Sequence, residues 1–328
     1  MTYYSNPLFF LLLSLPFLPF AHPKLTTNYY QKSCPKFNEI IKNIVTEKQE
    51  SRPSTAAATL RLFFLDCIVG GCDASILITS NFFNTAERDA DLSLSGDGFD
   101  AVARAKIALE IQCPGIVSCA DILAMATRDL LVAVGGPPYE IRLGRKDSLE
   151  SKLTDVKNQF PLATMTMSQL VSLFTSKGFT IQEMVALVGA HTIGFSHCKE
   201  FSNRLFKFSN DSEFDPAYNR QYAAGLRNLC ANYTKDPSMS AYNDVMTPWK
   251  FDNMYYRNLK SGLGLLATDS AMFEDKRTRP FVDMYANDQA RFFKDFAHVM
   301  EKLSVLHVKT GRKGEVRSRC DSFNQLGF

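Results

Sequence analysis

A short acidic loop carries oxygen donors that suit a metal ion. Asp66, Asp73 and Ser75 lie in one ten-residue stretch that also holds two glycines. Calcium binds about six to eight oxygens from carboxylates, hydroxyls and backbone carbonyls. The three side chains, with the carbonyls of Val69 and Gly71, can supply such a set. The alternative is that these acidic side chains are simply solvated.

Histidine is scarce, so each one that could bind a metal or move a proton matters. The sequence has five: His22, His191, His197, His298 and His307. His191 follows an apolar stretch at residues 184–190 and precedes Thr-Ile-Gly. A lone histidine at a helix end is usually structural, and the alternative is a metal ligand. His197, beside Cys198, fits a structural place.

Residues 59–75 contain a specific motif. They read Thr-Leu-Arg-Leu-Phe-Phe-Leu-Asp-Cys-Ile-Val-Gly-Gly-Cys-Asp-Ala-Ser. This segment resembles the distal haem segment of the secretory plant (class III) peroxidases, which reads Arg-x-x-Phe-His-Asp-Cys. Arg61, Phe64, Asp66 and Cys67 match it, and Leu65 stands at the histidine position.

The resemblance extends from about Tyr29 to Cys320 and implies the fold and the cofactors. That family has an all-α, mostly helical fold with four disulfides, one haem b and two calcium ions. Its haem is sandwiched between a distal and a proximal half. For this chain the resemblance implies one haem peroxidase domain at residues 22–328, with halves of about 22–165 and 166–328.

Leu65 removes the group that moves a proton in the family's reaction. Cleavage of peroxide carries a proton from the near oxygen to the far oxygen, and a neutral histidine serves as base and then as acid. The resemblance implies that Arg61 stabilises the developing negative charge and that Phe64 forms a dry distal wall. Leucine cannot bind a proton, so we expect strongly reduced turnover.

The residues around Leu65 offer no local substitute. No histidine lies between His22 and His191, and the family's asparagine that bonds the distal histidine aligns with Leu94. Two apolar residues at these positions indicate relaxed constraint. The alternative is a misread base, since histidine and leucine codons can differ by a single nucleotide.

On the proximal side, the resemblance makes His191 the iron ligand. The second ring nitrogen of such a histidine normally donates to a carboxylate, which fixes the tautomer and raises the basicity of the ligand. Asp269, in Leu-Leu-Ala-Thr-Asp, occupies the matching position. The alternative for Asp269 is a solvated turn residue.

The resemblance also implies two calcium sites. The first comprises Asp66, Val69, Gly71, Asp73 and Ser75, with Glu87 as a water-mediated outer ligand. The second comprises Thr192, Asp244, Thr247, Asp252 and the carbonyl of Lys250. Because Thr192 adjoins His191, the second ion would stiffen the segment that carries the haem ligand.

Eight cysteines indicate four disulfides in an oxidising compartment. Sequence alone leaves about a hundred pairings. The resemblance selects Cys34–Cys113, Cys67–Cys72, Cys119–Cys320 and Cys198–Cys230. The alternative, zinc binding by Cys67, Cys72, His197 and Cys198, needs free thiolates.

The N-terminus predicts export. Residues 8–20 are almost wholly apolar, Ala21 suits cleavage, and Pro16 and Pro19 interrupt a stretch too short to span a bilayer comfortably. Residues 1–21 therefore predict a signal peptide, with an apolar core helix as the alternative. We expect a secreted protein, extracellular, in the cell wall or in the vacuole, glycosylated at Asn210 and Asn232.

Helical patterns dominate the elements that must position these residues. An apolar helical face recurs at Phe37, Ile40, Ile41, Ile44 and Val45, and again at Phe293, Phe296, Ala297 and Met300. Residues 118–134 predict a long helix that ends before Gly-Gly-Pro. Capping boxes are predicted at Thr166–Gln169 and Thr180–Glu183. Residues 139–143 are the best strand candidate.

Composition limits the partners. The chain has 37 Lys and Arg against 34 Asp and Glu, a net charge of +3, and no dense basic run, which argues against nucleic-acid binding. No later apolar run is long enough to span a membrane. The resemblance implies a monomer that takes hydrogen peroxide and small phenolic donors, the donors docking at the haem edge near Phe160 and Pro161. The family's second proline there is Ala163.

Three functions fit these observations. The first is a secreted peroxidase that oxidises phenolic donors slowly because of Leu65. The second is a non-catalytic haem- and calcium-binding glycoprotein of the cell wall with the same fold. The third, a calcium-dependent structural protein without haem, requires that His191 bind no iron.

Overall fold

The structure is a computed structural model that describes residues 25–90 and 94–324; the predicted signal peptide lies outside them. The first half contains α1 (Phe37–Ser51), α2 (Thr55–Val69), η1 (Ser75–Leu77), η2 (Glu87–Asp89), α3 (Gly96–Gln112), α4 (Cys119–Ala133) and α5 (Leu153–Val156). The second half contains α6 (Met167–Ser176), α7 (Ile181–Val188), η3 (Gly189–Thr192), β1 (Phe195–His197), η4 (Cys198–Glu200), α8 (Ser202–Leu205), α9 (Arg220–Leu229), β2 (Ser240–Tyr242), α10 (Met254–Lys260), α11 (Ala267–Glu274), α12 (Arg279–Asn287), α13 (Gln289–Leu303) and η5 (Gly311–Lys313).

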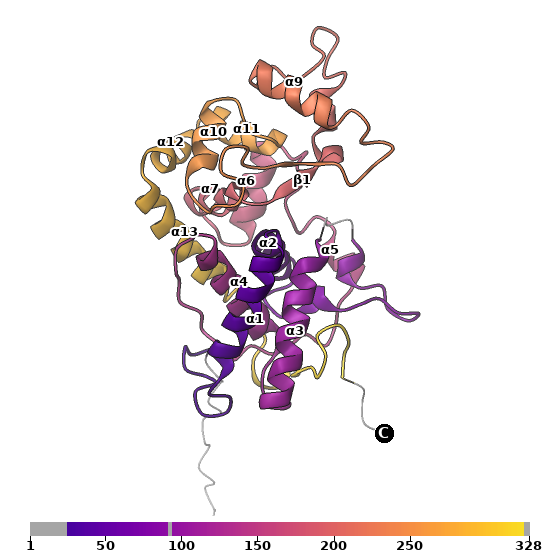
Figure 1. Cartoon of the computed structure of the whole chain (residues 1–328), viewed down its shortest axis with the longest axis vertical. Helices are drawn as coiled ribbons and strands as arrows, with labels where there is room; N and C mark the ends of the chain where they lie inside the picture. The colour runs from indigo at the N-terminus through magenta and orange to yellow at the C-terminus, as the bar shows by residue number, and fades with distance from the viewer. Residues whose placement is uncertain (1–24, 91–93, 325–328) are drawn as a thin grey trace, which may run out of the picture.

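The helices form two groups that follow the chain order (Figure 1). Helices α1 to α4 pack against one another in one group, and α6, α7 and α10 to α12 form the other. Helix α13 packs along α7 and also contacts α2, so it joins the two groups. The predicted mostly helical fold is thereby confirmed.

Helix α2 is the central element of the first group. Its side chains are apolar on nearly every face, which is typical of a helix buried on all sides. Arg61 and Asp66 are the charged exceptions within it. Asp66 is buried, and we therefore expect it to serve a site, because a buried charge without a partner is costly.

Local sequence signals account for most helix ends. Both predicted capping boxes are present, at the starts of α6 and α7. The predicted long helix at residues 118–134 is α4, and Ser118 caps it by accepting from the Asp121 backbone N–H. The two predicted apolar faces lie on α1 and α13.

The strand predicted at residues 139–143 is wrong. Tyr139, Ile141 and Leu143 are buried and the residues between them are exposed, so the alternation is real. The segment forms only an isolated bridge between Thr26 and Leu143. Alternation predicts a half-buried extended segment, whereas a strand also needs a partner along its length.

A two-stranded antiparallel sheet pairs β1, which follows His191 in the chain, with the distant β2. Gly194, just before β1, has φ +87°, a conformation that favours glycine. A Cβ at this position would also lie 3.0 Å from the Cβ of Ala57 in α2. Glycine here therefore lets the His191 segment approach α2 closely.

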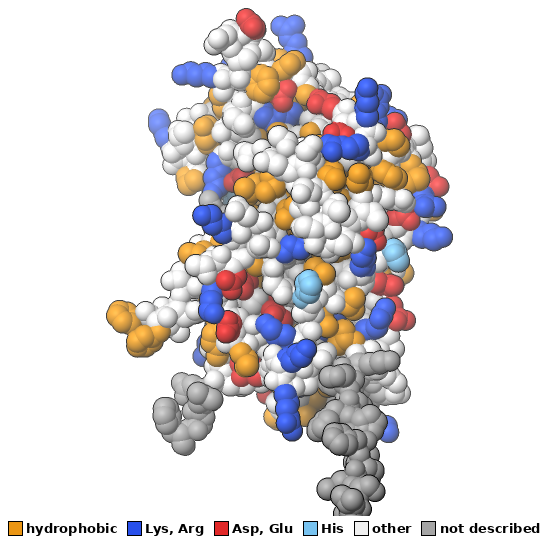
Figure 2. Space-filling model, turned by 180° about the vertical axis from the view of Figure 1, so that it is seen from behind, with side chains coloured by type: hydrophobic (Ala, Val, Ile, Leu, Met, Phe, Trp, Pro, Cys, Tyr) orange, Lys and Arg blue, Asp and Glu red, His pale blue; other side chains and the backbone are white. Residues whose placement is uncertain are grey.

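The cysteines form the four predicted disulfides, Cys34–Cys113, Cys67–Cys72, Cys119–Cys320 and Cys198–Cys230. The described residues hold no free cysteine, so the zinc alternative is wrong. Figure 2 shows acidic and basic side chains interspersed over one face of the molecule. Within the described residues, no helix has the length and apolar character needed to cross a membrane.

The Cys119–Cys320 disulfide is expected to contribute most to stability, because it closes a loop with a sequence separation of 201 residues. Cys198–Cys230 closes a separation of only 32 residues, and its two cysteines are equally well buried. Loop entropy predicts that replacing the first pair by alanine lowers the free energy of unfolding by roughly 1.5 kcal/mol more than replacing the second. Urea unfolding of both double variants tests this, and equal losses would contradict it.

Candidate active site

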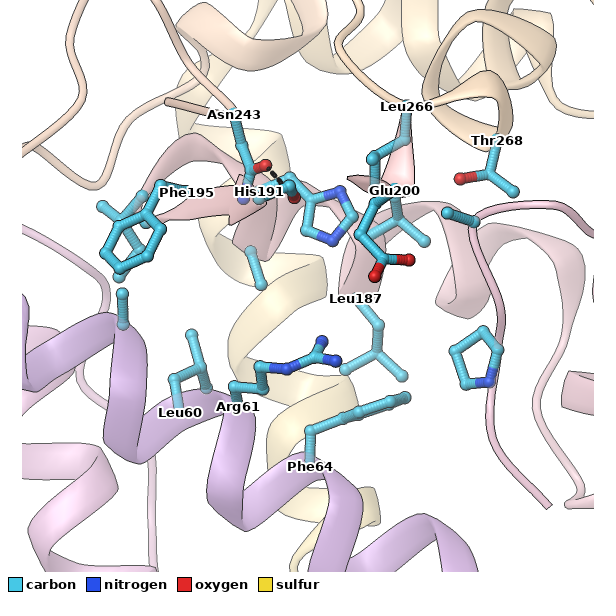
Figure 3. A pocket seen from close by; sticks show the side chains of 18 of the residues that line it. Leu60, Arg61, Phe64, Leu187, His191, Phe195, Glu200, Asn243, Leu266 and Thr268 are labelled. Atoms are coloured by element: carbon cyan, nitrogen blue, oxygen red, sulfur yellow. Dashed lines mark hydrogen bonds between the residues drawn. The ribbon is translucent and has the colours of Figure 1, made fainter. Parts of the chain in front are cut away.

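A cavity of about 450 Å³ lies between α2 on one side and α7 with η3 on the other (Figure 3). Most of its wall is apolar. The described lining residues that argue for function are Arg61 and Phe64 from α2, His191 from η3, and Pro161 from the loop between α5 and α6. The structure therefore brings predicted residues from both halves to one cavity.

His191 points into this cavity and is held from behind by a carboxylate. Its Nδ1 lies 2.9 Å from Oδ1 of Asp269, which is fully buried. The hydroxyl of Tyr255 donates to the same oxygen at 2.8 Å, and the Leu266 backbone N–H donates to Oδ2 at 3.0 Å. Because Nδ1 is engaged, Nε2 is the nitrogen left to bind a ligand in the cavity.

The surroundings of Asp269 keep it ionised. Burial by itself raises the pKa of this carboxyl, but attraction to His191 and hydrogen bonds from His191, Leu266 and Tyr255 outweigh burial and lower the pKa below its ordinary value. An ionised Asp269 fixes the Nδ1–H tautomer of His191 and increases electron density on the ring.

Figure 3 shows Arg61 and Phe64 projecting from α2 into the cavity, on the side opposite His191. More than a third of the Arg61 surface is accessible, because the residue faces the open space of the cavity. Protein surrounds that space, so Arg61 is still largely shielded from bulk water. This burial lowers the pKa of Arg61, and the nearby carboxylate of Glu200 opposes the shift. Arg61 thus supplies positive charge in an enclosed space, where it acts strongly.

Leu65, which we aligned with the family's distal histidine, is 1% exposed and belongs to the main hydrophobic core. It is not among the cavity-lining residues, whereas Leu94 is. Among the described lining residues, the imidazoles are His191 and His197, and both come from the second half. The α2 wall therefore offers Arg61 as its one ionisable group within the described residues.

The predicted donor edge also borders the cavity. Phe160, Pro161 and Ala163 all line it. So does His197, for which the sequence analysis gave only a structural place. The predicted glycosylation residues Asn210 and Asn232 are exposed.

The residues of the first predicted calcium site converge beside the Cys67–Cys72 disulfide. Asp66, Asp73, Ser75 and Glu87 are all at least 96% buried. The Ser75 hydroxyl donates to Glu87 at 3.0 Å, and Asp66 and Asp73 accept from the backbone N–H groups of Ala74 and Ser75. Burial, followed by repulsion from Asp73, raises the pKa of Asp66 well above its ordinary value.

One ammonium group faces this cluster. Lys309 Nζ lies 2.5 Å from Asp73 Oδ2 and 2.7 Å from the Ser148 hydroxyl. Among the described residues, Lys309 is the cation paired with these carboxyl groups, and Lys177 Nζ lies 3.4 Å from the Val69 carbonyl of the same predicted site. The three buried carboxyl groups are still short of positive charge, which fits a divalent ion. The Lys309 contact was not foreseen, since it joins residues 236 positions apart.

The residues of the second predicted calcium site also converge. The Thr192 hydroxyl lies 3.4 Å from both Asp244 Oδ2 and Asp252 Oδ1, and 3.5 Å from the Lys250 carbonyl. The Thr247 hydroxyl lies 3.2 Å from Asp244 and 3.1 Å from Asp252. All five predicted oxygen donors therefore surround one point next to the His191 segment.

Neither predicted calcium site consists only of His, Cys, Asp and Glu side chains. Within the described residues, no group of three or more His, Cys, Asp or Glu side chains is arranged to hold a metal. Each predicted site instead mixes carboxylates with hydroxyl and carbonyl oxygens, a donor set that suits calcium and not zinc or iron.

Without calcium, the stability of the first site is expected to fall as pH rises. Burial raises the pKa of Glu87 from 4.5 to about 7, so between these values the folded chain holds a proton that the unfolded chain has released. Stability is therefore lost through this interval, by up to roughly 3 kcal/mol. Urea unfolding in chelator at about pH 5 and 7 should show the loss, and Glu87→Gln should reduce it, while Asp66, whose pKa burial also raises, keeps a share of the pH dependence. Calcium, which needs the ionised carboxylate, should oppose it; an unchanged pH dependence in the variant would contradict this assignment.

The cavity would fit a flat, largely apolar cofactor whose metal binds one protein nitrogen. It has apolar walls, one imidazole nitrogen directed inward and a carboxylate that fixes the imidazole. This is how proteins hold haem iron through histidine. His191, Asp269 and Phe64 are the residues that would hold such a group.

The fold and the family comparison define the class of this protein. A profile of the peroxidase family, described as peroxidase, matches residues 40–288, so the chain belongs to the peroxidase family. It is 56% identical over 324 residues to Peroxidase 41 of Arabidopsis thaliana, covering 98% of each chain. It is 57% identical over 320 residues to Peroxidase 63 of that plant, covering 97% of this chain and 96% of the relative. The predicted family is thereby confirmed.

Proposed function

We propose that this chain is a secreted haem peroxidase that oxidises phenolic donors with hydrogen peroxide, and that Leu65 strongly reduces its turnover. The observation that carries the proposal is the His191–Asp269 pair, 2.9 Å apart, facing Arg61 across an apolar cavity. Membership of the peroxidase family supports the same reaction class.

Bound haem would supply the redox chemistry at iron. In this proposal His191 binds the iron through Nε2, and Asp269 keeps the ring in one tautomer. Arg61 stabilises negative charge that develops on the peroxide oxygens, because its guanidinium is held in an enclosed space. Phe64 excludes water, and the donor docks near Pro161 at the cavity edge.

The proton step is where this chain differs from its family's pattern. Leu65 can neither accept a proton from peroxide nor return it, and losing such catalysis costs about 10²–10⁴-fold. Two calcium ions would stiffen the structure on either side of the cavity, and the one at Thr192 adjoins the iron ligand.

The second candidate is a non-catalytic haem- and calcium-binding glycoprotein of the cell wall. It is favoured by the burial of Leu65 and by the absence of an imidazole or carboxyl group on the described part of the α2 wall. Secretion and glycosylation fit both candidates, because the four disulfides suit an oxidising compartment and both sequon asparagines are exposed.

The test uses full-length protein secreted from a eukaryotic host and loaded with haem. A Soret absorption band at one haem per chain supports both candidates and eliminates a structural protein without haem. Peroxide-dependent oxidation of guaiacol, a phenol, is expected to be measurable and slow. No peroxide-dependent oxidation above that of free haem would favour the non-catalytic protein.

A further inference from the structure

Among the described residues that line the cavity, Arg61 is the one Lys or Arg and Glu200 is the one Asp or Glu. Figure 3 shows the carboxylate of Glu200 directed into the cavity, between the levels of His191 and Arg61. The Glu200 side chain is 37% exposed, so it borders both the cavity and solvent. A carboxylate in this position meets molecules that enter from outside.

Glu200 also lies beside the segment proposed to dock donors. It ends η4, and its neighbours Cys198 and Phe201 belong to a small buried cluster against which Ala163 packs. Phe160, Pro161 and Leu162 line the same cavity as Glu200. An aromatic ring against this apolar segment would therefore have a carboxylate within reach of its substituents.

Lys199 and Arg61 are basic side chains near Glu200. Lys199 Nζ lies 3.8 Å from Glu200 Oε1, and both side chains are about two-fifths exposed. Exposed pairs of this kind contribute little energy because water screens them. Arg61 comes from the opposite wall, on α2, and its positive charge and the Glu200 carboxylate attract each other across the cavity.

We propose that Glu200 makes this cavity selective for aromatic donors that carry a positive charge, such as phenols with an alkylammonium arm. The inference rests on the proposed binding of phenolic donors at this edge. The phenol ring packs on the apolar segment around Pro161, and the ammonium pairs with the Glu200 carboxylate. An anionic arm of the same length meets repulsion instead.

Three ligands of similar shape test this proposal by equilibrium binding, without turnover. They are tyramine (cationic), 4-ethylphenol (neutral) and 3-(4-hydroxyphenyl)propionate (anionic), titrated into haem-loaded protein and followed by the shift of the haem absorption. Native protein is expected to bind tyramine about tenfold more tightly than the anion at low salt, as for one partly screened charge pair. The preference should shrink at about 0.15 M salt.

Glu200→Gln keeps the side-chain shape and is expected to reduce the tyramine preference to near unity. Glu150→Gln is the matched control, because Glu150 is 67% exposed, pairs with Lys152 at 2.6 Å and does not line the cavity. It should leave the preference unchanged. If Glu200→Gln fails to fold, Lys199→Gln serves instead and should increase the preference about twofold to threefold.

The outcomes separate the two proposals. Equal affinity of native protein for all three ligands, or an unchanged preference in Glu200→Gln, would overturn the role of Glu200 alone. If haem-loaded protein binds none of the three, the proposed donor site fails as well. If the chain takes up no haem, the proposed function itself fails.

Discussion

Replacing Leu65 by histidine is expected to raise the rate of reaction with hydrogen peroxide by about 10²–10⁴-fold at pH 7. Arg61 and Leu65 are four residues apart on α2, so they share one helix face. Leu65 lies in the core and does not line the cavity, so the imidazole at position 65 must reach the cavity from beside Arg61. The measurement is the rate of change of the haem absorption after stopped-flow mixing of haem-loaded protein with peroxide.

A control separates the position of the imidazole from its mere presence. Leu60 also lies on α2 and lines the cavity, so Leu60→His adds an imidazole at a neighbouring point of the wall. We expect it to give little acceleration, because acid–base catalysis depends on the geometry of the proton path. Both variants bury a polar ring, so circular dichroism and haem stoichiometry must match those of the native protein. Equal acceleration by both variants would contradict the assigned role of position 65.

Replacing His191 by alanine is expected to abolish stable haem binding. Losing an outer partner of a metal ligand costs about 10–100-fold in affinity, and His191 is here the proposed ligand itself. Asp269→Asn is therefore expected to weaken binding by about that factor, and His191→Ala by more. Haem transfer to excess apomyoglobin, followed by absorption, measures the loss in each variant.

His298→Ala is the matched control, because the His298 side chain is 72% exposed and does not line the cavity. Its haem transfer should equal that of the native protein. Added imidazole should restore part of the haem affinity of His191→Ala by filling the space of the missing ring. Tight haem binding by His191→Ala without imidazole would refute the proximal assignment.

Local signals and the family resemblance together anticipated most of the architecture. The capping boxes at Thr166 and Thr180 could be read directly, because a cap depends only on residues three positions apart. The four disulfides could not be derived from spacing and came from the resemblance. The same holds for the meeting of His191 with Asp269, 78 residues away.

Contacts particular to this chain were not predictable from its sequence. Tyr255 donates to Asp269, and Lys309 pairs with Asp73 across 236 residues, but neither residue stands in a motif that marks its partner. Glu200 follows the His191 segment in the sequence, and its residue type is usually found at a protein surface. Its side chain faces the cavity only because of the position of η4 in the fold. Such placements depend on tertiary packing, which residue type and periodicity do not encode locally.

The most direct test of the central claim is the ratio of peroxide rate constants, Leu65→His over native, measured between about pH 5 and 8. The account predicts a ratio of a hundredfold or more at pH 7 to 8. It also predicts that the ratio falls as pH drops through the histidine pKa of about 6.5, because a protonated imidazole cannot accept the proton from peroxide. A ratio near one across the whole range, with a fast native protein, would show that another group moves the proton and that Leu65 does not limit this chain.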